Sequence, residues 1–90
     1  MDLNDYRKQI DRIDEQLVAL FRQRMEAAAD IAAYKKANGL PVLDAERERA
    51  KLEDVCSKVP AALREHTAAI YAAIFAESRA YQEKRMEEMP

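Results

Sequence analysis

The stretch LFRQRMEAAADIAAYKK, residues 20–36, decides the fold because its pattern is helical along its whole length. It contains no glycine or proline, and its apolar residues continue a series that recurs every three or four residues, which predicts an amphipathic helix. The apolar members of this series are Ile10, Ile13, Leu17, Leu20, Ala27, Ile31 and Tyr34. Arg24 stands between Leu20 and Ala27, so a fixed positive charge occupies a position that should bury a leucine.

A second cation shares the face of Arg24. Arg24, Ala28, Ile31 and Lys35 are spaced four, three and four residues apart, so Lys35 lies within about 20° of the same line. Small residues leave space around the two cations, namely Ala27, Ala28, Ala29, Ala32 and Ala33. This arrangement indicates a pocket for an anion. The alternative is that both long side chains extend into solvent.

The composition limits the class of protein. A chain of 90 residues is expected to form one domain, residues 1–90. Its composition, with 36% charged residues, 49% apolar residues and one glycine, is typical of long helices. A net charge of -2 argues against general attraction to nucleic acid or to an anionic membrane surface. Any anion site must therefore be created locally.

Cysteine content and hydropathy indicate a cytoplasmic chain. The single cysteine, Cys56, excludes an intramolecular disulfide and a cysteine metal cluster, and we expect it to be a small half-buried helix residue. Asp11, Arg12 and Asp14 interrupt the first apolar run, so we expect no signal peptide. No stretch approaches the ~20 apolar residues that a membrane-spanning helix requires.

Three helices account for the whole pattern, so the predicted fold class is all-α. Asp2 or Asn4 can cap the first helix, which runs to Lys36 before Gly39 supplies a left-handed stop and Pro41 prevents continuation. A second helix is expected from a cap at Asp44 to about Ser57, and a third has Pro60 in its first turn. The third helix carries on one side Leu63, Ile70, Ile74 and Tyr81.

The first helix is too long for its own chain to cover. About 33 residues span ~50 Å, whereas a compact domain of this size has a radius of gyration of only ~12 Å. A second copy of the chain is the expected cover, which predicts an intertwined homodimer. In an antiparallel pair of first helices centred near Glu15 and Gln16, Arg7 of one chain would lie opposite Arg24 of the other.

Polar residues also occur on apolar lines of the other two helices. The line Tyr71, Ile74, Ser78, Gln82 and Arg85 turns polar at Ser78, where both Ser78 and Gln82 offer neutral hydrogen bonds. A polar helix end is the other interpretation of this line. The segment LDAERERAKLE, residues 43–53, places Arg47 and Glu48 in the first turn after Asp44, and on its own it is typical of a solvated surface with ion pairs.

Taken together, these residues resemble the all-α class of chorismate mutases. The resemblance covers nearly the whole chain and rests on four motifs in order, which are RKQIDRID (7–14), Arg24 with Lys35, PVLDAERER (41–49) and ESRAYQ (77–82). It implies an intertwined six-helix homodimer that converts chorismate to prephenate in phenylalanine and tyrosine biosynthesis. It implies neither cofactor nor metal, and no nucleic-acid or membrane partner.

The resemblance also implies a role for each site residue. Arg7 would enter the site from the neighbouring chain, Arg24 would bind a carboxylate, and Lys35 would contact the ether oxygen and a carboxylate of the substrate. The remaining implied contacts are Arg47 and Ser78 with carboxylates, Glu48 with the ring hydroxyl assisted by the backbone N–H of Asp44, and Gln82 with the ether oxygen.

The chemistry of this reaction agrees with the residues present. Chorismate is a dianion, and its rearrangement is an intramolecular pericyclic step that requires no nucleophile or general base. It requires a substrate held compact and donors where the breaking C–O bond places negative charge on oxygen. Arg24 would then interrupt the apolar face because the face opens there into a pocket.

Three other interpretations remain open. An isochorismate–pyruvate lyase resembles the same fold, but that family tends to lack the acidic residue at the position of Glu48. A non-catalytic helical dimerisation module would have no reason to keep Lys35, Ser78 and Gln82 on otherwise apolar lines. A mutase that needs a partner enzyme for full activity is also compatible with the sequence.

Overall fold

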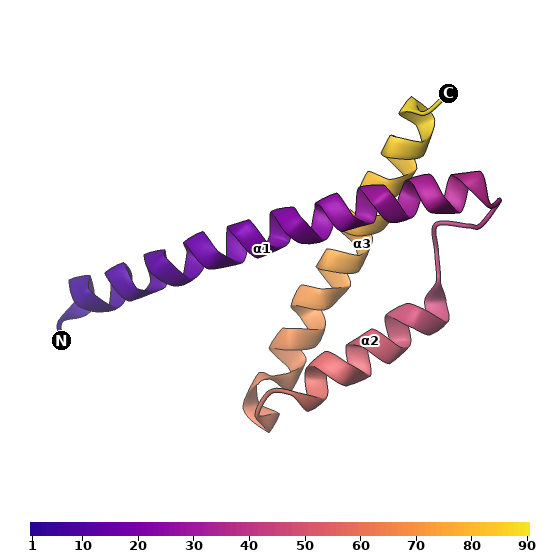
Figure 1. Ribbon diagram of the computed structural model, residues 1–90. Coiled ribbons are helices and arrows are strands. Elements are labelled where there is room, and N and C mark those ends of the chain that lie inside the picture. Colours follow the sequence, from indigo (N-terminus) through magenta and orange to yellow (C-terminus); the bar gives the residue numbers. More distant parts are fainter.

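The computed structural model describes residues 1–90 and contains three α-helices and one short 3₁₀ turn. The elements are α1 (Leu3–Ala37), α2 (Ala45–Ser57), η1 (Ala61–Leu63) and α3 (Arg64–Glu88). Helix α3 crosses the C-terminal half of α1, and α2 packs along α3, so the N-terminal half of α1 projects alone (Figure 1). The all-α prediction is confirmed.

The ends of α1 lie where the sequence predicts them. Asp2 is the cap, because its carboxylate accepts a hydrogen bond from the N–H of Asp5 at 2.9 Å while Asp5 accepts from the N–H of Asp2 at 3.1 Å. Asn4, the other candidate, lies inside the helix. At the far end Gly39 adopts a φ of 64°, the left-handed conformation that glycine takes without strain.

The start of α3 differs from the prediction. Asp44 caps α2 as expected, with its side chain accepting from the N–H of Arg47 at 3.0 Å. Pro60, however, is extended rather than helical, and its carbonyl accepts from the N–H of Leu63 at 2.9 Å to close a 3₁₀ turn. The α-helix therefore begins only at Arg64, because the tighter turn comes first.

Lys36 connects the C-terminal end of α1 to the C-terminal end of α3 by hydrogen bonds. Its ammonium donates to the carbonyl of Met86 at 2.6 Å and to that of Met89 at 2.8 Å. These carbonyls belong to the C-terminal turn of α3, where a cation is favourable to the helix dipole. The contact fixes the crossing of α1 and α3 near their C-terminal ends.

The core within one chain is very small. Four residues are buried, namely Ala28, Ala32, Ser78 and Gln82, and all lie where α1 crosses α3. The radius of gyration is 16.3 Å and the longest extent is 54 Å, whereas a compact chain of this length would have a radius of about 12 Å. None of the helices has the length and hydropathy of a membrane-spanning segment.

Candidate active site

A pocket lies between α1, α3 and the start of α2, on the packed half of α1. Its cavity volume is about 220 Å³, and its mouth is open to solvent. Seven of the eight predicted site residues line it, namely Arg24, Lys35, Asp44, Arg47, Glu48, Ser78 and Gln82. The eighth, Arg7, lies outside it on the exposed half of α1.

The pocket is positively charged although the chain as a whole is not. Its lining contains five cations, namely Arg24, Lys35, Arg47, Lys51 and Arg79, and two carboxylates, those of Asp44 and Glu48. The net charge of the chain is -2. The excess of three positive charges is therefore a local property of this site, and it favours a ligand with more than one negative charge.

Arg24 is half-buried and has no acidic partner in the chain. Its guanidinium lies 6.0 Å from the centre of the Phe75 ring, at the outer range of a cation–π contact. Phe75 in turn packs edge-on against Tyr71, with ring centres 5.8 Å apart. The aromatic pair thus supports Arg24 from one side, and its charged group remains available to an anion.

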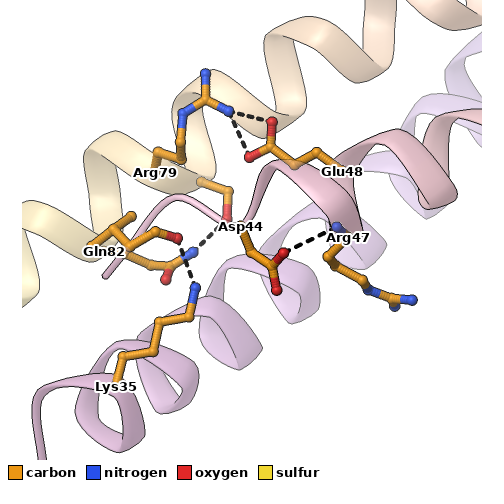
Figure 2. A network of polar contacts seen from close by, with 8 residues as sticks. Lys35, Asp44, Arg47, Glu48, Arg79 and Gln82 are labelled. Atoms are coloured by element: carbon orange, nitrogen blue, oxygen red, sulfur yellow. Dashed lines mark hydrogen bonds and ion pairs between the residues drawn. The ribbon is translucent and has the colours of Figure 1, made fainter. Parts of the chain in front are cut away.

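Lys35 points from α1 towards the loop that leads into α2. Its ammonium donates to the carbonyl of Val42 at 2.7 Å, and it lies beside Gln82 in the pocket (Figure 2). An ammonium has three N–H donors, so two remain for a ligand. The hydrogen bond to the loop restrains the long side chain in the direction of the pocket.

The two polar residues of α3 are buried where the line of the helix turns polar. Ser78 is 8% exposed and Gln82 is 6% exposed, and the side-chain amide of Gln82 donates to the Ser78 hydroxyl at 3.1 Å. The amide oxygen of Gln82 has no partner. An unpaired buried polar atom costs roughly 1–3 kcal/mol, so this oxygen is expected to accept a hydrogen bond from water or from a donor group of a ligand.

The start of α2 contributes an N–H donor as well as side chains. The backbone N–H of Asp44 donates to no acceptor in the chain, while the Asp44 carboxylate is occupied in capping the helix. Arg47 is exposed at the rim of the pocket, and Glu48 is half-buried inside it. The segment thus has both features considered from the sequence, since Asp44, Arg47 and Glu48 line the pocket while Arg49 forms exposed ion pairs with Glu46 and Glu53.

Three lining residues were not found from the sequence. Arg79 donates through one nitrogen to both carboxylate oxygens of Glu48, at 2.5 and 2.6 Å (Figure 2). Phe75 supports Arg24, and Lys51 lies further along α2. The spacing of Phe75, Arg79 and Gln82 by four and three residues was the available signal, since it places Arg79 on the face of Gln82.

The arrangement can bind an anion and stabilise negative charge, and nothing in it is organised as a metal site. No group of three His, Cys, Asp or Glu side chains lies close enough to hold a metal ion. The single histidine, His66, is exposed and lies outside the pocket. The groups gathered in the pocket are cations, neutral donors and a carboxylate held by an arginine.

Known proteins with the same features identify the family. A model described as chorismate mutase type II matches residues 6–83. The chain therefore belongs to the chorismate mutase type II family, and the resemblance stated from the sequence is confirmed. No solved structure matches the chain significantly.

The curated relatives are mostly longer proteins. The T-protein of Haemophilus influenzae is 39% identical over 51 residues, 57% of this chain and 14% of that protein. A bifunctional chorismate mutase/prephenate dehydratase of Aquifex aeolicus is 39% identical over 54 residues, 60% of this chain and 15% of its own length. A chorismate mutase of Methanocaldococcus jannaschii is 40% identical over 47 residues, 52% of this chain and 48% of that protein. The chain thus spans at most about half the length of these relatives.

Proposed function

We propose that the chain catalyses the rearrangement of chorismate to prephenate, and that two chains complete each site. The observation that carries this proposal is the convergence of Arg24, Lys35 and Gln82 in one pocket with an excess of positive charge. Chorismate has two carboxylates, and guanidinium groups bind carboxylates in a fixed geometry. Family membership supports the same substrate class.

In this proposal the pocket first holds the substrate compact. Arg24 binds one carboxylate, with Arg47 adding charge at the rim and Ser78 donating a hydrogen bond. When the pocket holds the two reacting ends of the molecule together, conformational freedom is lost on binding and no longer has to be lost in the reaction step. Because one C–O bond breaks and one C–C bond forms within the substrate, no proton needs to move.

Lys35 and Gln82 then stabilise the ether oxygen as the C–O bond breaks. Both are donors on the same side of the pocket, and the Lys35 ammonium is restrained by the Val42 carbonyl. The Gln82 amide donates to Ser78 in the free chain. Because the Ser78 hydroxyl accepts in this contact, its own O–H is available to donate to a carboxylate, and the Gln82 amide would turn towards the ether oxygen when the substrate binds.

Glu48 and Asp44 bind the ring hydroxyl in this proposal. The carboxylate of Glu48 accepts a hydrogen bond from the hydroxyl, and the unoccupied backbone N–H of Asp44 donates to the hydroxyl oxygen. A carboxylate offers about four acceptor positions, so the contacts with Arg79 do not exhaust it. The presence of Glu48 in the pocket favours chorismate over isochorismate, which carries its hydroxyl elsewhere on the ring.

The second chain supplies the cover for α1 and the remaining arginine. Every residue from Leu3 to Val18 is exposed, and this segment carries large apolar side chains that include Ile10 at 54% and Leu17 at 58% exposure. Arg7 belongs to the same segment and is too far along the helix to reach the pocket of its own chain. An antiparallel partner would bury the apolar face and bring its Arg7 to Arg24.

Two measurements test the proposal together. The purified chain should consume chorismate, followed by its absorbance, and release prephenate identified by mass. Sedimentation at micromolar concentration should give twice the chain mass. Pyruvate and salicylate formed from isochorismate would support a lyase instead, and a folded monomer with full activity would exclude the shared site.

A further inference from the structure

The contact between Arg79 and Glu48 is unlike the other ion pairs of the molecule. It joins residues 31 positions apart, on α3 and α2, whereas the others join residues three or four positions apart on one helix. Its side chains are 33% and 26% exposed, and both line the pocket. An ion pair between helices inside a candidate site suggests a role in that site.

The geometry of the contact defines the orientation of Glu48. One nitrogen of Arg79 lies 2.5 and 2.6 Å from the two carboxylate oxygens, so both oxygens are directed towards that nitrogen. The side chain of Glu48 makes no other hydrogen bond in the chain. Without Arg79 it would be free to rotate into solvent.

Arg79 also offsets the negative charge of Glu48. A carboxylate in a pocket for a dianion repels the ligand, and the two other helices offer Glu48 no acidic or basic partner except Arg79. Asp44, the other carboxylate of the lining, is turned to the start of its own helix, where the N–H groups stabilise it. Glu48 also lies in the first turn of α2, but its carboxylate accepts no backbone N–H and is bonded only to the guanidinium.

We propose that Arg79 is a positioning residue, which orients the Glu48 carboxylate towards the ligand hydroxyl and neutralises its charge in the presence of a dianionic substrate. This inference rests on the proposed function, because it assigns a role to a further residue of the same site. Arg79 acts through Glu48 and makes no contact with the reacting atoms.

A double-mutant cycle separates these roles. Four chains are compared by kcat and KM for chorismate, namely wild type, Arg79→Met, Glu48→Gln and the double variant. Arg79→Met should lower kcat about tenfold, the lower end expected for a hydrogen bond to a charged group. In the Glu48→Gln background the same change should alter kcat by less than about twofold, because no carboxylate remains to be oriented.

The salt dependence of KM reports the charge of the pocket separately from the orientation of Glu48, which the kcat cycle reports. In wild type KM should rise with added salt, since the Debye length shortens to about 10 Å at 0.1 M and screens the attraction of the dianion. Arg79→Met should make this dependence shallower and Glu48→Gln should make it steeper. The double variant should return to the wild-type dependence, because the charge of its pocket is again that of wild type.

Arg49→Met is the matched control. Arg49 also pairs with two carboxylates, those of Glu46 and Glu53, at 2.7 and 3.0 Å, but the pair is exposed and lies outside the pocket. This variant should keep the wild-type kcat and the wild-type salt dependence. Arg79→Lys, which keeps the charge with a shorter reach, should lose only about threefold in kcat and retain the salt dependence.

The outcomes distinguish the inference from the proposed function. An inactive wild-type chain would overturn both. With an active wild type, equal losses of kcat from Arg79→Met in the two backgrounds would show direct substrate contact and overturn the positioning role alone. If Arg79→Met does not fold, as judged by its thermal melting curve, Arg79→Lys decides. A kcat of Arg79→Lys equal to that of wild type, or a salt dependence altered by the lysine, would likewise overturn the proposal.

Discussion

The two halves of α1 form one continuous helix but lie in opposite environments. From Leu3 to Val18 every residue is exposed, whereas in the second half Ala28 and Ala32 are 3% and 0% exposed against α3. The exposed half carries isoleucine and leucine, and the packed half carries alanine. Small side chains allow α3 to approach closely, while large ones suit a helix that arrives from outside the chain.

This difference agrees with the proposal that one helix serves two sites. The packed half presents Arg24 and Lys35 to the pocket of its own chain. The exposed half presents Arg7 together with an apolar face that a soluble monomer rarely leaves uncovered. The comparison therefore predicts that catalysis depends on residues of the packed half and dimer formation on residues of the exposed half. Arg7 is the one residue of the exposed half that we expect to affect catalysis directly.

The largest expected effect tests the chemistry of the packed half. Lys35→Ala removes a donor to developing negative charge, which typically costs about 10²–10³ in turnover, and should leave the dimer intact. Arg22→Ala is the control, because Arg22 is an exposed cation of α1 that pairs with Glu26 outside the pocket. Steady-state kinetics and sedimentation check both; a Lys35→Ala variant with most of its turnover would reject the assigned role.

Local patterns in the sequence predicted most of the fold and most of the charged and polar residues that line the pocket. Helical spacing alone places Arg24 on the same face as Lys35, and Ser78 on the same face as Gln82. The two faces then meet when α1 packs against α3. The cap at Asp44 follows equally from its place before an amphipathic segment. Each of these features depends on residues a few positions apart.

Features that depend on contacts between distant residues were not predicted. Arg79 meets Glu48 across 31 positions, and no periodicity specifies which charged side chains of two helices will face each other. The 3₁₀ turn after Pro60 depends on one hydrogen bond to Leu63 and is not encoded by the presence of proline alone. The cross-chain placement of Arg7 stays a prediction, because it concerns two chains.

The next effect tests the link between the two halves. Arg7→Ala and Arg24→Ala chains should each be nearly inactive as homodimers. Unfolded together and refolded, they should recover about a quarter of the wild-type activity, since about half of the randomly paired dimers are mixed and one of their two sites is whole. Mass spectrometry verifies the mixed dimers. No recovery in their presence would place Arg7 in its own chain.

A smaller and pH-dependent effect concerns the donor on α3 that faces the packed half. Gln82 donates without titrating, so the wild-type rate should be nearly flat from pH ~6 to 8. An unperturbed glutamic acid titrates near 4.3, so Gln82→Glu should gain up to about tenfold in rate for each unit of falling pH. Gln82→Ala is the control, with a low and flat profile. A flat profile for Gln82→Glu would count against the contact with the ether oxygen.

The smallest effect lies on α2, which packs on α3 and leaves the exposed half of α1 free. The hydrogen bond from Lys58, at 3.1 Å, lowers the pKa of Asp54 below its ordinary value of 3.8, with Lys51 adding a weaker attraction. A carboxyl whose pKa is lower in the folded state stabilises the fold above its unfolded pKa, and this contribution is lost as the pH falls through the folded value. Because Asp54 is exposed to solvent, the contribution is small.

Asp54→Asn should therefore melt slightly below wild type at pH 7, and the two melting temperatures should converge as the pH is lowered from 5 to 3. A gap that widens with acid would show that Asp54 is held by something other than these two lysines.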